Sequence, residues 1–409
     1  MRQLLMTSRP LPPSQEKRAA QTPIEDQSHV TVVDQHLRAA AAERASDVHF
    51  EPKEDHVRVR FRIEGVLQER KALPLTLGIA VISRLKMLSK MDMAERRVPQ
   101  DGNFSTVAAG SERTVRASIF PSCYGEKIVL HIASPVMASK DLHELGLPER
   151  MLPTVIEALN RPSGLILTTG PAGSGKTSTL YSLIQSLDPI RRNIVTLEDG
   201  IEVRMPNLTQ GETNARAGFT FATGLRAIEG QDPDVILVGE LTDVETAAIA
   251  FRCALTGRLV LSTLHAPSTV ETITRILDMG LEPFAVSSGL SVIIAQRLAR
   301  RLCAACKTSA PADPEMVASL LRFLPADIPA ELFVAKGCDL CGGTGYRGRT
   351  AIFEAVTMDD EIRDSIRSKS PTRVYRQLLA ARQVPTLRRE GWLRVCAGET
   401  TIEEVMRVC

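Results

Sequence analysis

The chain lacks any long hydrophobic run. None of its apolar stretches approaches the ~20 residues that a membrane-spanning helix needs, so any membrane contact is expected to be peripheral. The first residues also lack a secretory signal, because only Leu4, Leu5 and Met6 lie between Arg2 and Arg9, far short of an apolar signal core of about 7–15 residues. We therefore expect a cytoplasmic protein.

Net charge and aromatic residues are also scarce. The formal net charge is +2 at pH 7, and aromatic residues make up 4% of the 409 residues. Nucleic-acid-binding proteins usually carry a basic field and aromatic stacking platforms, so no nucleic acid partner is expected. By contrast, 44% hydrophobic and 24% charged residues exclude wholesale disorder. The length is sufficient for more than one hydrophobic core.

Cysteine is sparse, and half of it lies in two short motifs. Cys303 and Cys306 form one C-x2-C pair, Cys338 and Cys341 form another, and 31 residues separate the pairs. Four thiolates in this spacing match a closed tetrahedral Zn²⁺ site. A redox motif would normally stand alone, and chance spacing is the other alternative. We predict structural zinc. The cysteines read as ordinary residues are Cys123, Cys253, Cys396 and Cys409.

What the chain does have is a phosphate-binding loop. A short apolar strand leads into G-x-x-x-x-G-K-T, which starts at Gly170 and ends with Lys176 and Thr177. Glycines let the loop turn its N–H groups toward phosphate, the lysine neutralises β and γ oxygens, and the threonine holds Mg²⁺. A glycine-rich turn with a fortuitous lysine is the alternative. The predicted nucleotide-binding residues are Gly170, Gly173, Ser174, Gly175, Lys176, Thr177 and Ser178.

The first part of the chain reads as a flexible tail followed by a small α/β domain. Residues 1–27 are rich in proline and polar residues, and the domain is expected over 28–136, with a linker over 137–146. VRVRFRIEG alternates strictly, so Arg58, Arg60 and Arg62 share one face of a strand. Such a row is either a solvated sheet face or, if the domain closes over the nucleotide, an anion-binding face. A helix over 75–88, a turn over 99–102 and strands near 114–119 and 127–132 complete this domain.

The second part of the chain reads as an α/β nucleotide-binding core of the RecA-like P-loop class, expected over 147–300. Continuous apolar strands alternate with helical segments there, which predicts a mostly parallel sheet covered on both faces. Ligands of such sheets gather at the carboxyl ends of the strands. A zinc subdomain is expected over 301–350 and short charged helices over 351–409.

Polar residues suited to hydrolysis follow the strands of this core. DPDVILVGE ends on Glu240, placed as the acid of a second NTPase strand beside Mg²⁺ and the attacking water. IVTLEDGIE ends a strand on Glu198 and Asp199, which orient water or only cap a loop. LVLSTLH places His265 at another strand end, where it is either structural or a sensor of the γ-phosphate.

Taken together, these segments resemble the secretion ATPases of type II secretion systems and type IV pilus assembly, the GspE/PilB group. In the first domain the matching motifs are ASDVHFEP, VRVRFRIEGVL, ISRLKML, AERRVPQDG and YGEKIVL. In the second they are the acidic box TLEDGIE, the Walker B region GFTFATGLRAI and QDPDVILVGEL, and the histidine box ALTGRLVLSTLHA. The paired cysteines followed by TGYRGR are similar to the assembly branch rather than the retraction ATPases.

The resemblance implies a cytoplasmic homohexamer, associated peripherally with the inner membrane, that holds ATP between its two domains. It implies that Glu198 and Glu240 serve hydrolysis, that His265 senses the γ-phosphate and that Arg116 reaches the nucleotide from the N-terminal domain. The implied partners are an inner-membrane platform protein and a membrane-recruitment protein. ATP-driven domain movements would then pull pilin-like subunits into a pseudopilus or pilus. A longer N-terminal recruitment domain, common in the family, is not recognised in this sequence.

Several positions depart from the family pattern. These are Asn103, His131, Gly200, Glu229-Gly230, Thr242 and Arg258. Three of the departures replace arginines that normally meet phosphates or neighbouring subunits, and each lost guanidinium removes about 1.5–3 kcal/mol of charge-assisted hydrogen bonding. Arg258 and the Arg58, Arg60 and Arg62 face are possible replacements. We therefore expect slow intrinsic turnover. The alternatives are a catalytically weak, nucleotide-gated subunit of such a machine and a nucleic-acid motor built on the same core.

Overall fold

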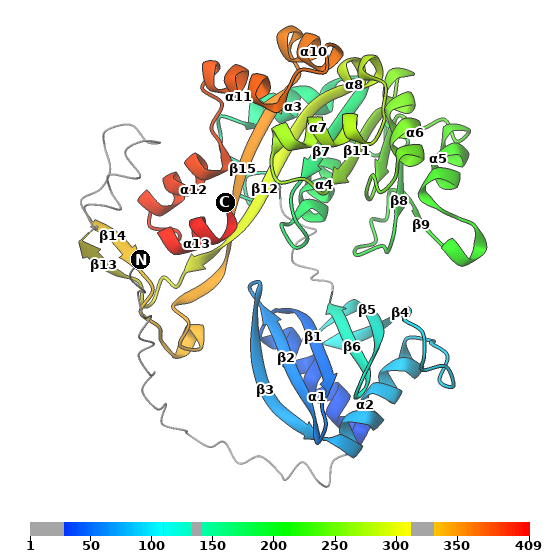
Figure 1. The fold of residues 1–409 in the computed structure, drawn as a ribbon, viewed down its shortest axis with the longest axis vertical. Coiled ribbons are helices and arrows are strands. Elements are labelled where there is room, and N and C mark those ends of the chain that lie inside the picture. The colour runs from blue at the N-terminus through cyan, green and yellow to red at the C-terminus, as the bar shows by residue number, and fades with distance from the viewer. Residues whose placement is uncertain (1–27, 109, 133–140, 312–330) are drawn as a thin grey trace, which may run out of the picture.

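The computed structural model describes residues 28–108, 110–132, 141–311 and 331–409. The expected tail over 1–27 and part of the expected linker lie outside these residues. Figure 1 shows an N-terminal sheet domain below a larger α/β body, with the carboxyl-terminal helices along one side. No helix among the described residues is long and apolar enough to span a bilayer.

The N-terminal domain is an antiparallel sheet with two helices on one face. Its strand order is β3-β2-β1-β6-β5-β4. The strands are β1 Ala45–Pro52, β2 His56–Ile63, β3 Val66–Pro74, β4 Gln100–Ala108, β5 Ser111–Ser122 and β6 Gly125–Ile132. The helices are α1 His29–Ala42 and α2 Leu75–Leu88. Ser28 caps α1 by accepting a hydrogen bond from the Val30 amide. One apolar cluster, which includes Val33, Leu85 and Phe50, joins helices and sheet.

The expected turn over 99–102 is wrong. Gln100 and Gly102 already belong to β4 and pair with Ile119 and Ala117 of β5. Gly102 serves close packing rather than a turn, because a Cβ atom there would lie 2.1 Å from the backbone oxygen of Ser89. The glycine therefore lets the strand pass directly over the end of α2.

The alternation predicted for VRVRFRIEG is confirmed in β2, where Val57, Val59 and Phe61 are buried. Its arginines, however, pair within their own domain. Arg58 and Arg60 donate to Glu51 at 2.8 and 2.6 Å. The same face also carries Arg62, whose Nε lies 3.3 Å from a carboxylate oxygen of Asp47. This face is neither simply solvated nor open to an added anion.

The larger body is built on a seven-stranded sheet in the order β15-β12-β7-β11-β10-β8-β9. The strands are β7 Gly164–Thr169, β8 Ile194–Glu198, β9 Thr209–Glu212, β10 Val235–Val238, β11 Leu259–Leu264, β12 Leu290–Leu302 and β15 Tyr346–Thr357. Neighbours pair in parallel except β12 and β15, which are antiparallel. This confirms the predicted P-loop α/β core.

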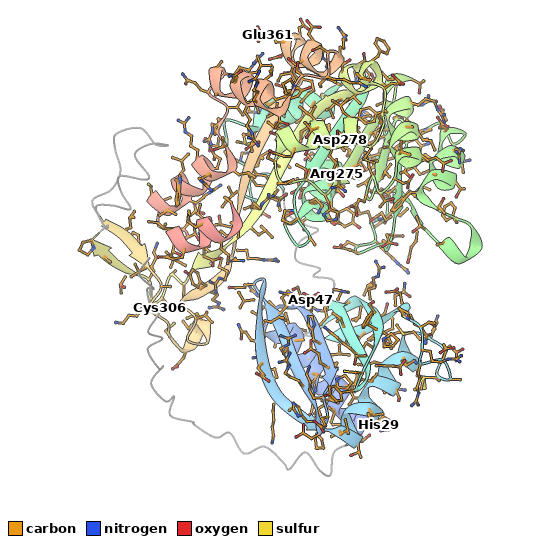
Figure 2. The ribbon with its side chains drawn as sticks, viewed as in Figure 1. His29, Asp47, Arg275, Asp278, Cys306 and Glu361 are labelled. Atoms are coloured by element: carbon orange, nitrogen blue, oxygen red, sulfur yellow. The ribbon has the colours of Figure 1, made fainter. Side chains whose placement is uncertain are left out.

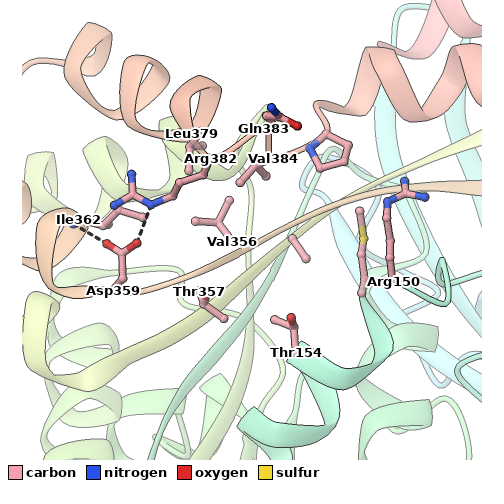
Figure 3. A pocket seen from close by; sticks show the side chains of 13 residues that line it. Arg150, Thr154, Val356, Thr357, Asp359, Ile362, Leu379, Arg382, Gln383 and Val384 are labelled. Atoms are coloured by element: carbon pink, nitrogen blue, oxygen red, sulfur yellow. Dashed lines mark hydrogen bonds and ion pairs between the residues drawn. The ribbon is translucent and has the colours of Figure 1, made fainter. Parts of the chain in front are cut away.

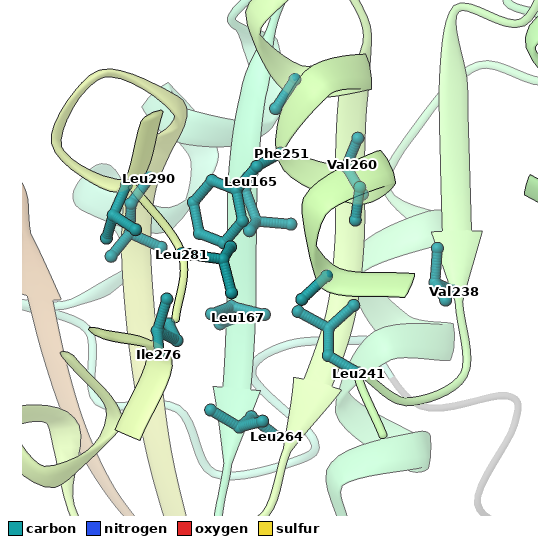
Figure 4. Packing of buried hydrophobic residues seen from close by; sticks show 14 of the residues in the cluster. Leu165, Leu167, Val238, Leu241, Phe251, Val260, Leu264, Ile276, Leu281 and Leu290 are labelled. Carbon is teal, nitrogen blue, oxygen red and sulfur yellow. The ribbon is translucent and has the colours of Figure 1, made fainter. Parts of the chain in front are cut away.

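Helices cover both faces of this sheet. They are α3 Leu152–Asn160, α4 Lys176–Gln185, α5 Phe221–Glu229, α6 Val244–Leu255, α7 Thr269–Asp278 and α8 Pro283–Gly289. Leu165 and Leu167 of β7 pack into the cluster under α6 to α8, which Figure 4 shows, whereas Ile166 packs into the cluster under α3 and α4. Alternate residues of one strand thus enter different cores, which explains why its sequence is apolar throughout.

The carboxyl-terminal part contains a separate two-stranded sheet of β13 and β14, then the sheet strand β15, and then a series of helices. The elements are β13 Thr308–Pro311, β14 Glu331–Val334, α10 Asp360–Arg367, α11 Thr372–Ala381, α12 Leu387–Cys396 and α13 Ile402–Val408. The expectation of helix is wrong for residues 351–357, because Ala351, Ile352 and Phe353 are buried in β15. The expected domain limits at 300 and 350 fall within β12 and β15, and the division into domains stays a prediction.

Candidate active site

The phosphate-binding loop joins β7 to α4. Gly170, Gly173 and Gly175 have φ of 155°, 74° and 90°. Space is also limiting, since a Cβ atom at Gly170 would lie 2.6 Å from the backbone oxygen of Gln296 and one at Gly175 would lie 2.7 Å from its Nε2. No side chain caps α4, so its first amides stay available for an anion at the helix N-terminus.

Lys176 is buried at the start of α4, with 9% of its surface exposed. Its Nζ donates to the backbone oxygens of Gly170 and Pro171 at 3.0 and 3.1 Å and lies 3.3 Å from Nδ1 of His265. Burial lowers the pKa of this ammonium to about 8, against an opposing effect of Glu240. The loop carbonyls therefore hold a cation in a poorly hydrated position that suits phosphate oxygens.

His265 and Glu240 meet beside this lysine. Both follow strands that run parallel to β7, so the sheet brings their ends to one edge. The Nε2 of His265 lies 3.1 Å from Oε1 of Glu240. The imidazole therefore bridges Lys176 and Glu240 in the structure.

Glu198 lies at the end of β8, two strands from β11, and is 4% exposed. Its carboxylate accepts hydrogen bonds from the hydroxyl of Tyr181 on α4, from Oγ1 of Thr196 at 2.6 Å and from Nε2 of Gln210 at 3.2 Å. Burial, followed by the nearby Glu198 charge, raises the pKa of Tyr181. Helix α4 and strand β9 thus fix this carboxylate from both sides.

A further acid, Glu202, was missed by sequence reasoning. Thr177, the predicted Mg²⁺ ligand, lies near its carboxyl group. The residue is exposed as a whole, but burial of its carboxyl group and, second, the charge of Glu198 raise its pKa, whereas Thr177 acts to lower it. The only sequence signal is its place within the acidic box, four residues after Glu198.

Arg116 reaches this edge of the sheet from the N-terminal domain but contacts Asp199. The two side chains lie 2.6 Å apart and are 51% and 61% exposed. Nearby, Asn103 of β4 donates to Glu212 of β9 at 3.3 Å. The β4–β5 side of one domain therefore meets the acidic side of the other (Figure 1).

Arg258, considered above as a replacement for arginines that the family has and this chain lacks, does not reach the carboxyl edge of the sheet. Arg258 precedes β11, and its backbone oxygen accepts a hydrogen bond from the Gly164 amide at the start of β7. It is therefore at the amino edge of the sheet, a strand length of roughly 15–20 Å from the phosphate-binding loop. Thr242 is bound to Asp243, which caps α6, and His131 is bound to Asp47 in the other domain.

The four motif cysteines lie together near β13 and β14; Figure 2 labels Cys306 among them. Neighbouring sulfur atoms are 3.7 to 3.9 Å apart, and all four lie within 4.8 Å of one another. A tetrahedron with Zn–S bonds of about 2.3 Å requires S–S separations of about 3.8 Å, whereas a disulfide requires about 2.05 Å. The donor set fits zinc.

A hollow of about 230 Å³ lies between α3, β15 and helices α10 and α11, and no residue of the phosphate-binding loop lines it. Figure 3 shows the side chains around it. Its two arginines are already engaged. Arg382 donates to Asp359 and Glu361, each at 2.6 Å, and Arg150 pairs with Glu390. The chemistry of the chain is therefore assigned to the sheet edge and not to this hollow.

Comparisons with known proteins match this geometry. A family model described as type II/IV secretion system protein matches residues 23–407. The type II secretion system protein E of Pseudomonas aeruginosa is 44% identical over 384 residues, covering 94% of this chain and 76% of that protein. The type IV pilus assembly ATPase PilB of Thermus thermophilus is 40% identical over 375 residues, covering 91% of this chain and 42% of that protein.

Solved structures of ATPases have the same fold as this chain. The ATPase DotB of Legionella pneumophila superposes with a TM-score of 0.65 at 19% identity, covering 97% of each chain. The pilus retraction motor PilT with bound ADP gives a TM-score of 0.60 at 25% identity, covering 92% of this chain and 96% of that one. The chain therefore belongs to the type II/IV secretion system protein family, within its GspE/PilB group of secretion and pilus assembly ATPases.

Proposed function

We propose that this secretion or pilus assembly ATPase works as a cytoplasmic homohexamer at the inner membrane, where ATP hydrolysis drives assembly of a pseudopilus or pilus. The observation that carries the catalytic part is the meeting of Lys176, His265 and Glu240 at one end of the parallel sheet. The family relationship supports the rest, since relatives are named as parts of secretion and pilus systems.

In this proposal each residue of the sheet edge has a defined role. Lys176 and the loop amides bind the phosphates, and Thr177 would hold Mg²⁺, which would supply charge to polarise the phosphate oxygens. Glu240 orients the attacking water, and His265, already in contact with both Lys176 and Glu240, responds to the γ-phosphate. The hydroxyl of Thr177 and the carboxylates nearby are oxygen ligands of the kind that Mg²⁺ prefers.

Glu198 is the second proposed acid for hydrolysis. Three hydrogen bonds, from Tyr181, Thr196 and Gln210, hold its carboxylate. Acting on water therefore requires that one of these bonds be released, which makes Glu198 dependent on the position of α4 or β9.

Zn²⁺ is proposed as a structural cofactor of the four cysteines. The sulfur separations support it. The platform protein, the recruitment protein and peripheral membrane association are proposed from the family alone, and no nucleic acid partner is proposed. Salt-sensitive binding of single-stranded DNA to the purified protein would contradict that last point.

A catalytically weak, nucleotide-gated subunit is the second candidate. Its supporting observations are that Arg258 lies at the amino edge of the sheet and that Thr242, where the family has an arginine, contacts Asp243. The complete set of Lys176, Glu240 and His265 favours hydrolysis instead.

The experiment that separates the two is Mg²⁺-dependent ATP hydrolysis, measured with the oligomeric state of the same samples. Lys176→Ala is expected to abolish turnover, and Lys71→Ala, which removes an exposed lysine of β3, is the matched control. Turnover that survives in Lys176→Ala would refute the assigned site. ATP binding by assembled rings without turnover would favour the gated subunit.

A further inference from the structure

Two residues of β12 lie against the active site without belonging to any motif discussed above. Ala295 pairs with Thr169, the last residue of β7, so Gln296 and Arg297 emerge beside the phosphate-binding loop. Gln296 accepts a hydrogen bond from Oγ1 of Thr179 on α4 at 2.6 Å, and its backbone oxygen packs against Gly170.

Arg297 is 8% exposed, and within the described part of the chain its hydrogen bonds go to backbone oxygens. Its Nη2 donates to Pro267, its Nη1 to Gln296 at 2.9 Å and its Nε to Val408 at 2.9 Å. One guanidinium therefore joins the loop after β11, the strand β12 and the last residue of α13. Five rigidly arranged donors make arginine suited to such a junction.

The Pro267 contact lies next to the catalytic histidine. His265 precedes Pro267 by two residues, and the same loop is held on its other side by Oγ1 of Thr169, which contacts the backbone oxygens of Leu264 and Ala266 at 2.9 and 3.2 Å. Thr169 and Arg297 thus fix the loop between them. A fixed loop keeps the imidazole between Lys176 and Glu240.

A second effect of Arg297 is electrostatic. The ammonium of Lys176 is close enough to be affected by it: burial is the main cause of the lowered pKa of Lys176, and the positive charge of Arg297 acts in the same direction. The arginine is therefore part of the surroundings of the phosphate-binding loop, although it donates no hydrogen bond to Lys176.

We propose that Arg297 is a positioning residue for ATP hydrolysis, which fixes the His265 loop through Pro267 and links it to α13 through Val408. The proposal rests on the ATPase activity assigned above. Through this link, a partner that displaces α13 would alter the placement of His265 without touching the nucleotide.

The test compares Arg297→Gln with Arg300→Gln in the full-length chain. Arg300 lies on the same strand and also holds α13, since it pairs with Glu404 at 2.6 Å and stacks on Tyr346, but its contacts do not include the His265 loop. Both variants weaken the docking of α13. Only Arg297→Gln releases Pro267.

Arg297→Gln is expected to lower kcat roughly 10- to 100-fold, as for loss of one or two charge-assisted hydrogen bonds, while the Kd for a non-hydrolysable ATP analogue changes less than about threefold. Arg297→Lys, which keeps the charge and one donor direction, should recover part of kcat. Equal losses of kcat in the Arg297→Gln and Arg300→Gln variants would overturn the proposal.

Amide hydrogen exchange supplies a readout that needs no turnover. The segment 262–268 is expected to exchange faster in Arg297→Gln and unchanged in Arg300→Gln, whereas α13 exchanges faster in both. Unchanged exchange of 262–268 in Arg297→Gln would also overturn the proposal. If the wild-type protein proves inactive, the ATPase assignment fails by itself and exchange still decides the role of Arg297. If Arg297→Gln does not fold, the exchange of 262–268 is measured in Arg297→Lys instead.

Discussion

Lys176 carries a positive charge in a buried position, and this makes the stability of the nucleotide-free protein depend on pH. The pKa of Lys176 is lowered from 10.5 to about 8, mainly by burial. Between these pH values the unfolded chain binds the proton more tightly than the folded chain, so the free energy of unfolding rises with pH. Below about pH 8 the ammonium is charged in both states, so the full free-energy cost of burying its charge lowers the stability of the folded protein.

We predict that Lys176→Met removes this dependence. The difference in stability between variant and wild type should shrink by about 3 kcal/mol as the pH rises from 7.5 to 10.5, from 1.36 kcal/mol per pKa unit. Chemical unfolding of both proteins across this range measures it. If the stability difference between Lys176→Met and wild type stays constant or grows with pH, the pKa of Lys176 is not lowered by burial.

Tyr181 provides a second prediction at this scale. Its hydroxyl donates to the buried carboxylate of Glu198. Tyr181→Phe removes that donor and leaves Thr196 and Gln210, and we expect a loss of about 1–3 kcal/mol in unfolding free energy. The control is Tyr124→Phe, because Tyr124 is 51% exposed. If Tyr181→Phe and wild type are equally stable in thermal and denaturant unfolding, the hydrogen bond from Tyr181 to Glu198 does not stabilise the protein.

Residues in compact motifs could be predicted from the sequence, and residues that meet only through the fold could not. Lys176, Thr177 and the cysteine pairs have fixed spacings that state their chemistry. Gln210 and Arg297 stand in no such spacing. They reach the site because the sheet order places β9 beside β8 and β12 beside β7, which no local pattern encodes.

At the scale of elements, the cysteine knuckles pack backbone against backbone. Gly337 packs against the backbone of Gly343, where a Cβ atom would lie 2.5 Å from its oxygen. The proposed Zn²⁺ would hold this closely packed backbone together. We predict one zinc per chain, measured by elemental analysis of purified protein.

Replacing both Cys306 and Cys341 by serine should remove this zinc and lower the thermal midpoint, with faster amide exchange over 331–346. Cys123→Ser is the control, since Cys123 is exposed and lies in the other domain. Retained zinc in the double variant would show that the ion binds elsewhere. Wild-type protein without zinc, at unchanged stability, would argue against the structural role.

Periodic elements were predictable, and elements that depend on distant partners were not. α2 and β2 follow from their own helical and alternating patterns. β12 contains Gln296, Arg297, Arg300 and Arg301, which favour no strand by themselves, and its extended form rests on pairing with β7 and β15. The short β9, TQGE, likewise has no apolar pattern and exists by pairing with β8.

At the scale of the whole molecule, polar side-chain contacts join the N-terminal sheet domain to the larger body. Arg116–Asp199 is an exposed pair, worth roughly 0–1 kcal/mol. Asn103–Glu212 and the contact of Glu64 with the Gly348 amide are further links between the two parts. Weak contacts of this kind allow the relative domain movement that an ATP-driven motor requires.

The Arg116–Asp199 contact predicts that substitutions of its two residues change KM for ATP in opposite directions. If Arg116 leaves Asp199 to meet the nucleotide, Arg116→Ala should raise KM for ATP roughly tenfold, as for a lost charge-assisted hydrogen bond. Asp199→Asn removes the competing carboxylate and should lower KM. Arg97→Ala, at an exposed pair within the N-terminal domain, is the control. A change of KM in the same direction for both variants would contradict the exchange of partners.

The loss of arginines at the family's arginine positions should appear as a lower rate of ATP turnover. Arg58 and Arg60 are bound to Glu51, Arg258 is at the amino edge of the sheet, and Thr242 is bound to Asp243. None of these groups supplies the missing positive charge at the phosphates. Because transition-state charge on the phosphoryl oxygens is then less well stabilised, we predict a kcat well below 10 s⁻¹, about the median for enzymes.

Restoring one guanidinium tests the cause of the slow rate. Thr242→Arg, in assembled hexamers, should raise kcat about tenfold, because a single charge-assisted hydrogen bond is worth about 1.5 kcal/mol or more. Thr256→Arg adds the same charge at the amino edge, beside Arg258, and should have no effect. A wild-type kcat near 10 s⁻¹ would refute slow turnover, and equal rates for the two variants would show that net charge, rather than its position at the carboxyl edge, sets the rate.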